Sequence, residues 1–97
     1  MPKGYMISAH RSEADPVKRA AYLALAAPAT IAAGGRFLAG GDCRVVAKEN
    51  GIAQRTVLIE FDSFDAAVAF YESAAYQKAL DALAGGADRD IRIFEGI

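Results

Sequence analysis

The segment of residues 55–80 limits the possible folds most, because a strand pattern in it leads directly into a helix pattern. The strand pattern reads TVLIEF, which is β-branched and apolar over a strand's length, with Val57, Ile59 and Phe61 on one face. The Asp-Ser pair at positions 62–63 then offers side-chain oxygens that cap the start of a helix. A strand with one wholly apolar face needs a covering layer, so the segment predicts helices packed on a sheet.

The helix that follows this strand is expected to stop and restart at Ser73. Residues 66–71 supply an apolar stripe at helical spacing, and Ser73 then provides a second capping hydroxyl. The restarted helix carries Tyr76 and Leu83 on its apolar side, and the glycine pair at positions 85–86 ends it.

The first third of the chain predicts a strand and a long helix. Gly4–His10 alternates as a strand does, with Met6, Ser8 and His10 on one face. A helix is expected to start at Asp15-Pro16 and to end at the glycine pair 34–35. Pro28 removes a backbone donor inside this helix and should kink or interrupt it. The residues expected to face the sheet are Val17, Ala20, Ala21, Leu25, Ala29 and Ala32.

The remaining segments predict further strands. Arg36–Ala39 reads as a short strand, and Cys43–Lys48 is expected to continue the same edge after a bend at the intervening glycines. Residues 49–51, Glu-Asn-Gly, predict a turn. Asp90–Glu95 predicts the last strand.

This order of elements predicts an α+β fold, the ferredoxin-like split β-α-β sandwich, with two helical regions on one face of a four-stranded antiparallel sheet. With 97 residues, the chain is expected to form a single domain, residues 1–97. The other sheet face would stay uncovered, with Met6, Leu58 and either Phe37 or Leu38 contributing to it. Pairing two such faces would bury them, so we expect a homodimer with the architecture of a dimeric α+β barrel.

Charge and composition argue against several classes of function. The net charge is −1 and no cluster of lysine and arginine occurs, so no nucleic-acid partner is expected. No apolar run is long enough to span a membrane, and the start of the chain lacks a signal-peptide core, so we expect a cytoplasmic protein without membrane association. One cysteine and one histidine form neither a disulfide nor a zinc ligand set, so no metal and no cofactor are expected.

Several stretches resemble one known family over essentially the whole chain. These are GGRFLAGG, RTVLIEFDSFDAAVAFYES, AYQKAL and the closing FEG. The sequence is similar to the family known as domain of unknown function 1330, within the dimeric α+β barrel superfamily. The resemblance implies a homodimer of ferredoxin-like subunits and names no reaction. Distant relatives of this architecture include cofactor-free antibiotic-biosynthesis monooxygenases, muconolactone isomerases and haem-dependent chlorite dismutases.

Two residues are candidates for acid–base chemistry. His10 is the only side chain that ordinarily titrates near neutral pH, and it could be a general base or a haem ligand at the mouth of the barrel, or a solvent-facing residue at a strand end. Glu60 lies in the middle of an apolar strand, where an unpaired carboxylate is costly. It is either a general base of raised pKa or the partner of Arg36 or Arg44 in a structural ion pair.

Four further residues are candidates for ligand binding. Arg36 and Arg55 each begin a strand and could hold an anionic ligand, or could pair with acidic neighbours. Tyr71 and Tyr76 flank the helix break and could line a pocket, or could anchor the core or an interface.

Three classes of function stay open at this point, so the sequence leaves undecided whether the protein is an enzyme. The first is a homodimer that binds a small hydrophobic or anionic ligand. The second is a cofactor-independent monooxygenase or isomerase acting on a small aromatic substrate, since such chemistry needs only a dry pocket, an oriented base and a positioned substrate. The third is haem binding through His10.

Overall fold

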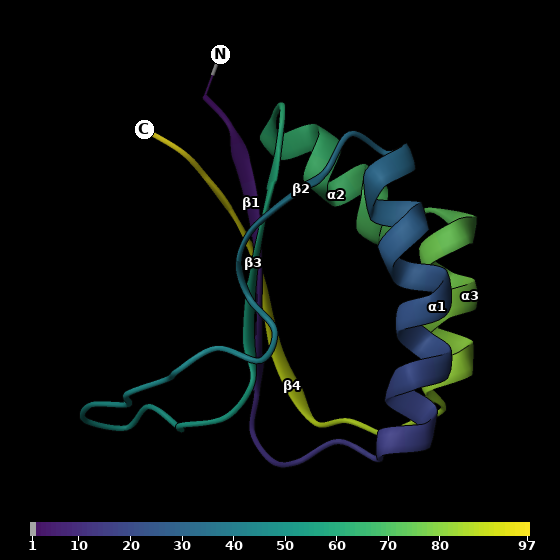
Figure 1. The fold of residues 1–97 in the computed structure, drawn as a ribbon. Coiled ribbons are helices and arrows are strands. Elements are labelled where there is room, and N and C mark those ends of the chain that lie inside the picture. Colours follow the sequence, from purple (N-terminus) through teal and green to yellow (C-terminus); the bar gives the residue numbers. More distant parts are fainter. Residues whose placement is uncertain (1) are drawn as a thin grey trace.

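The computed structural model describes residues 2–97 and has the predicted ferredoxin-like α+β fold. Its antiparallel sheet has four strands in the order β2-β3-β1-β4. All the helices lie on one face of this sheet, as Figure 1 shows. In chain order the elements are β1 (Gly4–His10), α1 (Pro16–Ala32), β2 (Arg36–Gly40), β3 (Thr56–Phe61), α2 (Phe64–Glu72), α3 (Ala74–Leu83) and β4 (Arg89–Glu95).

The predicted helix break is confirmed, and serine hydroxyls define both helix starts. Ser63 Oγ accepts a hydrogen bond from the backbone N–H of Ala66 at 3.0 Å and caps α2. Ser73 Oγ accepts from the backbone N–H of Tyr76 at 3.2 Å and donates to the carbonyl of Phe70 at 2.7 Å. The same residue therefore ends α2 and starts α3.

Strand β1 lies in the middle of the sheet, and its alternation decides which residues face the helices. It pairs with β3 and β4, and its register sets Met6 opposite both Ile59 and Ile93. Met6 therefore faces the helices and is only 2 % exposed. The prediction that Met6 contributes to the uncovered face is wrong, because the apolar face of β3 and its partners on β1 must point to the same side.

The uncovered face is formed by the other set of strand residues. Tyr5 and Ile7 of β1, Leu58 of β3 and Phe94 of β4 lie on it, and the Tyr5 and Phe94 rings stack with centroids 5.7 Å apart. Leu58 thus lies where the sequence predicted it. We call this surface the open face.

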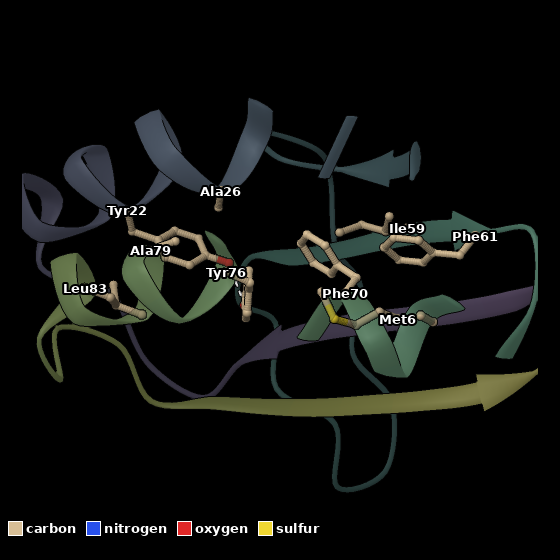
Figure 2. Packing of buried hydrophobic residues seen from close by; sticks show 10 residues of the cluster. Met6, Tyr22, Ala26, Ile59, Phe61, Phe70, Tyr76, Ala79 and Leu83 are labelled. Atoms are coloured by element: carbon tan, nitrogen blue, oxygen red, sulfur yellow. Dashed lines mark hydrogen bonds between the residues drawn. The ribbon is translucent and has the colours of Figure 1, made fainter. Parts of the chain in front are cut away.

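The core between the sheet and the helices is built largely from aromatic rings (Figure 2). Phe70 lies between Phe61 and Tyr76, with ring centroids 5.2 Å and 4.8 Å away. The start of β1 approaches the turn before α2 so closely that a Cβ at Gly4 would lie 2.2 Å from the carbonyl oxygen of Ser63. Only glycine fits at this position without moving the backbone.

Helix α1 presents a different side to the core from the one predicted. Its buried residues are Tyr22, Ala26 and Thr30, whereas Val17 and Leu25 are 77 % and 45 % exposed. Of the six residues predicted to face inward, Ala29 alone packs against the core. The prediction is wrong for the other five, which are exposed: Val17, Ala20, Ala21, Leu25 and Ala32. The helix is apolar on nearly all sides, so its pattern does not select one face. It also continues unbroken past Pro28 to Ala32, so the predicted interruption is absent.

The predicted strand over Cys43–Lys48 is not formed. Gly40 and Gly41, with φ of 117° and 83°, redirect the chain where the pairing of β2 with β3 ends. Residues 42–54 then form an irregular arm that projects from the sheet on the side away from the helices (Figure 1). The predicted turn within it is confirmed, since Gly51 N–H donates to the carbonyl of Lys48 at 2.9 Å. Within residues 2–97, no helix has both the length and the apolar character needed to cross a membrane.

Candidate ligand cavity

A cavity of about 400 Å³ lies between α1 and the helix-facing side of the sheet. Because α1 packs mainly along α3, it leaves space between itself and the strands. Most of the wall is apolar: Leu23, Ala26 and Ala27 come from α1, and Val57 and Ile59 come from β3. Further apolar lining comes from Met6, Phe37, Leu38, Ala39, Leu83 and Ala87.

One end of this cavity is polar and carries positive charge. His10 at the end of β1, Arg19 on α1, Arg55 before β3 and Arg89 at the start of β4 all line it. Within residues 2–97, no aspartate or glutamate lines this cavity. The four groups come together because β1, β3 and β4 meet here: His10 pairs with Arg89 across the sheet, and its N–H donates to the carbonyl of Arg55 at 2.9 Å. We call these four residues the cationic end.

A chain of hydrogen bonds leads from the cationic end into the core. Arg89 Nη1 donates to the hydroxyl of Tyr22 at 3.2 Å, and the guanidinium carbon lies 4.9 Å from the Tyr22 ring centroid. The hydroxyls of Tyr22 and Tyr76 are 2.8 Å apart and point toward each other in Figure 2. Burial, together with the neighbouring Tyr22, raises the pKa of Tyr76, so the Tyr76 hydroxyl keeps its proton at physiological pH.

His10 is a neutral imidazole at neutral pH. Its side chain is 7 % exposed, and burial lowers its pKa, with the positive charges of Arg89, Arg55 and Arg19 adding to the effect. Within residues 2–97, neither His10 nor the neighbouring Ser8 makes a side-chain hydrogen bond. Both residues line the cavity, so their polar atoms are available to a molecule inside it.

Three of the six candidate residues from the sequence meet at this cavity. His10, Arg55 and Tyr76 line it. Tyr71 does not: its ring packs beside that of Tyr76, with centroids 5.1 Å apart, at the end of α2.

Glu60 and Arg36 lie on the open face, with the sheet between them and the cavity. Arg36 Nε donates to Glu60 Oε1 at 2.9 Å, and the Tyr5 hydroxyl donates to Glu60 Oε2 at 3.1 Å. The hydrogen bond from Arg36 is the main reason that the pKa of Glu60 is lowered. The predicted raised pKa of Glu60 is therefore wrong, and the alternative ion pair with Arg36 is confirmed. His10 and Glu60 cannot act together on one ligand in a single chain, because they project from opposite faces.

Four lining residues, Ser8, Arg19, Tyr22 and Arg89, were missed by the sequence analysis. Arg89 lies two residues before Ile91, so strand alternation places it on the helix-facing side, but the predicted strand began one residue too late. Tyr22 was missed because the predicted inward side of α1 was wrong.

A second depression, of about 370 Å³, adjoins the cationic end on the outside. It shares His10, Arg19, Gly41 and Arg55 with the cavity, and Glu13 and Asp42 add acidic groups there. Asp42 is fully exposed and lies 3.4 Å from Arg55 Nη1. Among residues 2–97, no cluster of three or more histidine, cysteine, aspartate or glutamate side chains is arranged to hold a metal ion.

Comparison with known proteins supports the fold. The profile of the family described as "Domain of unknown function (DUF1330)" matches residues 3–97. A protein of unknown function from Rhodopseudomonas palustris superposes with a TM-score of 0.70 at 17% identity, covering 99% of this chain and 83% of the other. No match was found among curated proteins.

Two further structures show the same fold. A dimeric ferredoxin-like protein of unknown function from Thermobifida fusca YX superposes with a TM-score of 0.64 at 19% identity, covering 97% of this chain and 91% of the other. SnoaB, described as a cofactor-independent oxygenase from Streptomyces nogalater, superposes with a TM-score of 0.63 at 14% identity, covering 97% and 92%. At these identities the likeness establishes the fold alone.

Proposed function

We propose that the protein binds a small, largely apolar molecule in the cavity between α1 and the sheet. The chain belongs to the DUF1330 family, whose description assigns no activity, so the proposal is drawn from the cavity. One observation carries this proposal. An apolar cavity of about 400 Å³ ends in a small set of convergent polar groups, and it falls within the range of about 300–1,000 Å³ that is typical of ligand pockets. Side chains that only filled a core would close such a space, because protein interiors are packed densely.

A neutral fluorescent probe, N-phenyl-1-naphthylamine, tests this proposal. We expect saturable binding with enhanced emission, and loss of that binding in Ala27→Phe, which places a ring inside the cavity. Ala24→Phe is the matched control, because Ala24 lies on the exposed side of the same helix. Absence of binding to the wild-type protein, or equal binding to both variants, would overturn the proposal.

We further propose that a second copy of the chain covers the open face, giving a homodimer. Two observations support it. The open face presents the stacked Tyr5 and Phe94 rings, and Phe94 is 45 % exposed. The arm of residues 42–54 projects on this same side, with Val46 79 % exposed (Figure 1). A sheet face of this kind is an association surface, and two-fold pairing of identical faces closes it.

Light scattering of Leu58→Asp tests the dimer, since the variant places a charge in the middle of the open face. We expect the wild-type protein to have the mass of two chains and the variant that of one. A variant that kept the dimer mass would show that this face is not the interface.

A second candidate function, cofactor-independent oxygenation or isomerisation, is favoured by one observation. A neutral imidazole, that of His10, faces an apolar cavity beside three arginines. Such a base can take a proton from a substrate, and the arginines would stabilise the resulting anion. SnoaB shares the fold and is described as a cofactor-independent oxygenase.

Solvent deuterium exchange into a panel of phenols and 1,3-dicarbonyl compounds tests the proton-removal step. Exchange by the wild-type protein that His10→Gln abolishes would support catalysis, and exchange unaffected by that change would exclude His10 as the base. No exchange into any member of the panel would leave ligand binding as the better account.

A further inference from the structure

We infer that the ligand of the cavity carries one carboxylate, which is bound at the cationic end beside Arg89 and His10 while the apolar body lies against α1 and β3. This inference rests on the proposed function, since it names the chemical class of the ligand held in the same cavity.

Within residues 2–97, Arg89 has no acidic partner. Its sequence neighbours Asp88 and Asp90 are engaged elsewhere, with Arg11 at 3.3 Å and with Arg92 at 3.1 Å. Within residues 2–97, the one side-chain hydrogen bond that Arg89 makes is to the hydroxyl of Tyr22. Arg89 is partly buried against the Tyr22 ring, and a charge without a counter-ion in such a low-dielectric site is costly.

Further positively charged and polar groups lie with Arg89 at the cationic end. Arg19, Arg55 and His10 line the same end, and all three contribute positive charge or a polar ring. The acidic groups in the neighbourhood are Glu13 and Asp42 in the outer depression, and Asp42 is fully exposed. A cationic end with low-dielectric walls therefore concentrates a positive potential inside an apolar cavity. That combination suits an amphiphilic anion.

Among anions, a carboxylate fits the cationic end best. Arg55 already has Asp42 beside it and His10 is neutral. Within residues 2–97, Arg89 and Arg19 are then the charges at this end that have no acidic partner, and Arg89 is the one hydrogen-bonded into the cavity wall. Moving from water into a largely apolar cavity costs a phosphate dianion more than it costs a carboxylate monoanion. The planar fork of a guanidinium matches the two oxygens of a carboxylate, and the Ser8 hydroxyl and the His10 ring can supply further hydrogen bonds at the same end.

A pair of ligands that differ only in charge tests the inference. 2-Naphthoate and 2-naphthamide have nearly the same shape, and each can be titrated against bound N-phenyl-1-naphthylamine. We expect 2-naphthoate to displace the probe at a concentration at least about tenfold lower, as a charge-assisted hydrogen bond would produce. Equal displacement would overturn the carboxylate inference while leaving the proposed function intact, whereas absence of probe binding would remove the proposed function itself.

Variants of two arginines on the same strand locate the anion. Arg89→Gln should remove the preference for 2-naphthoate and keep probe binding. Arg92→Gln should change neither, because Arg92 is exposed and faces away from the cavity. A preference that survived Arg89→Gln would overturn the assignment to Arg89.

The single histidine of the chain gives a readout that needs no variant. Bound 2-naphthoate should raise the pKa of His10, followed by NMR of its ring protons, because an anion nearby favours the protonated imidazole. Bound 2-naphthamide should leave that pKa almost unchanged. An unaltered His10 pKa at saturating 2-naphthoate would place the carboxylate elsewhere and contradict the inference.

Discussion

The hydrogen-bond chain behind the cavity predicts that two similar substitutions have unequal costs. Tyr22→Phe and Tyr76→Phe each delete one hydroxyl, and the two hydroxyls are hydrogen-bonded to each other at 2.8 Å. The Tyr22 hydroxyl also accepts from Arg89 at 3.2 Å, so it belongs to two hydrogen bonds. Tyr22→Phe therefore removes a partner from both Tyr76 and the partly buried charge of Arg89, whereas Tyr76→Phe leaves Tyr22 bonded to Arg89.

The expected losses of unfolding free energy follow from the number of hydrogen bonds that each variant removes. A net hydrogen bond contributes about 1 kcal/mol, and a bond to a charged donor contributes about 1.5–3 kcal/mol. We expect Tyr76→Phe to lower the free energy of unfolding by about 1 kcal/mol and Tyr22→Phe to lower it by about 2–3 kcal/mol. In a domain of this size, that difference corresponds to roughly 4–8 °C in melting temperature for each kcal/mol.

Urea unfolding followed by circular dichroism measures both values, and the double variant completes a cycle. Tyr76→Phe should cost little once Tyr22→Phe is present, because the bond between the two hydroxyls is already lost. Tyr22→Phe should still cost about 1–2 kcal/mol in the Tyr76→Phe background, because it removes the bond to Arg89. Equal losses of unfolding free energy for the single variants, or a larger loss for Tyr76→Phe, would refute the proposed order of hydrogen bonds from Arg89 through Tyr22 to Tyr76. Negligible losses for both would indicate that the two hydroxyls are hydrogen-bonded to water in the cavity and not to each other.

Three other predictions concern pH and packing. His10 has a lowered pKa in the folded protein, so its contribution to stability should be present above its unfolded pKa of about 6.5 and be lost as the pH falls through the lower folded value; thermal melts between pH 7.5 and 5 should show this slope, and His10→Gln should reduce it. Glu60 also has a lowered pKa, so Glu60→Gln should lower the melting temperature slightly at neutral pH and have no effect at acid pH where Glu60 is protonated; an equal loss at both values would argue against the ion pair. Gly4→Ala should destabilise the protein by more than about 2 kcal/mol in denaturant titrations, because its Cβ would collide with the Ser63 carbonyl, and a neutral result would mean that the turn can move away.

The parts of the fold that could be predicted are those whose residues carry an unambiguous local signal. Serine hydroxyls at positions 63 and 73 fixed both helix starts, since a capping oxygen satisfies backbone N–H groups that have no other partner. The alternation of β3 likewise identified the face that turned out to contact the helices. These features depend on residues close together in the sequence.

The errors arose where the outcome depends on distant partners. Helix α1 is apolar on nearly every side, so its own pattern does not show which side faces the core. Tyr22 faces inward and is hydrogen-bonded to the hydroxyl of Tyr76 on α3, a partner that the local pattern cannot reveal. Cys43–Lys48 has strand-like composition, but the glycines at positions 40–41 direct it away from any neighbouring strand, so its backbone has no partner to pair with.

The candidate site was predictable in part for the same reason. His10 and Arg55 stand at strand ends, and strand ends on one sheet edge meet in space. Arg89 likewise stands at the start of β4. The sequence places an aspartate on each side of it, which suggests that its charge is paired. In the structure these aspartates pair with Arg11 and Arg92 instead. Glu60 was a candidate general base, but it lies on the open face, and the sheet separates it from the cavity.

The most direct test of the account is an NMR titration of the ¹⁵N-labelled protein with N-phenyl-1-naphthylamine. The largest changes in amide chemical shift should fall on the cavity wall, in residues 22–27 of α1, residues 55–59 and residues 8–10. Changes confined to Tyr5, Leu58 and Phe94 would show that the open face binds apolar molecules and that the cavity does not, and would contradict the account.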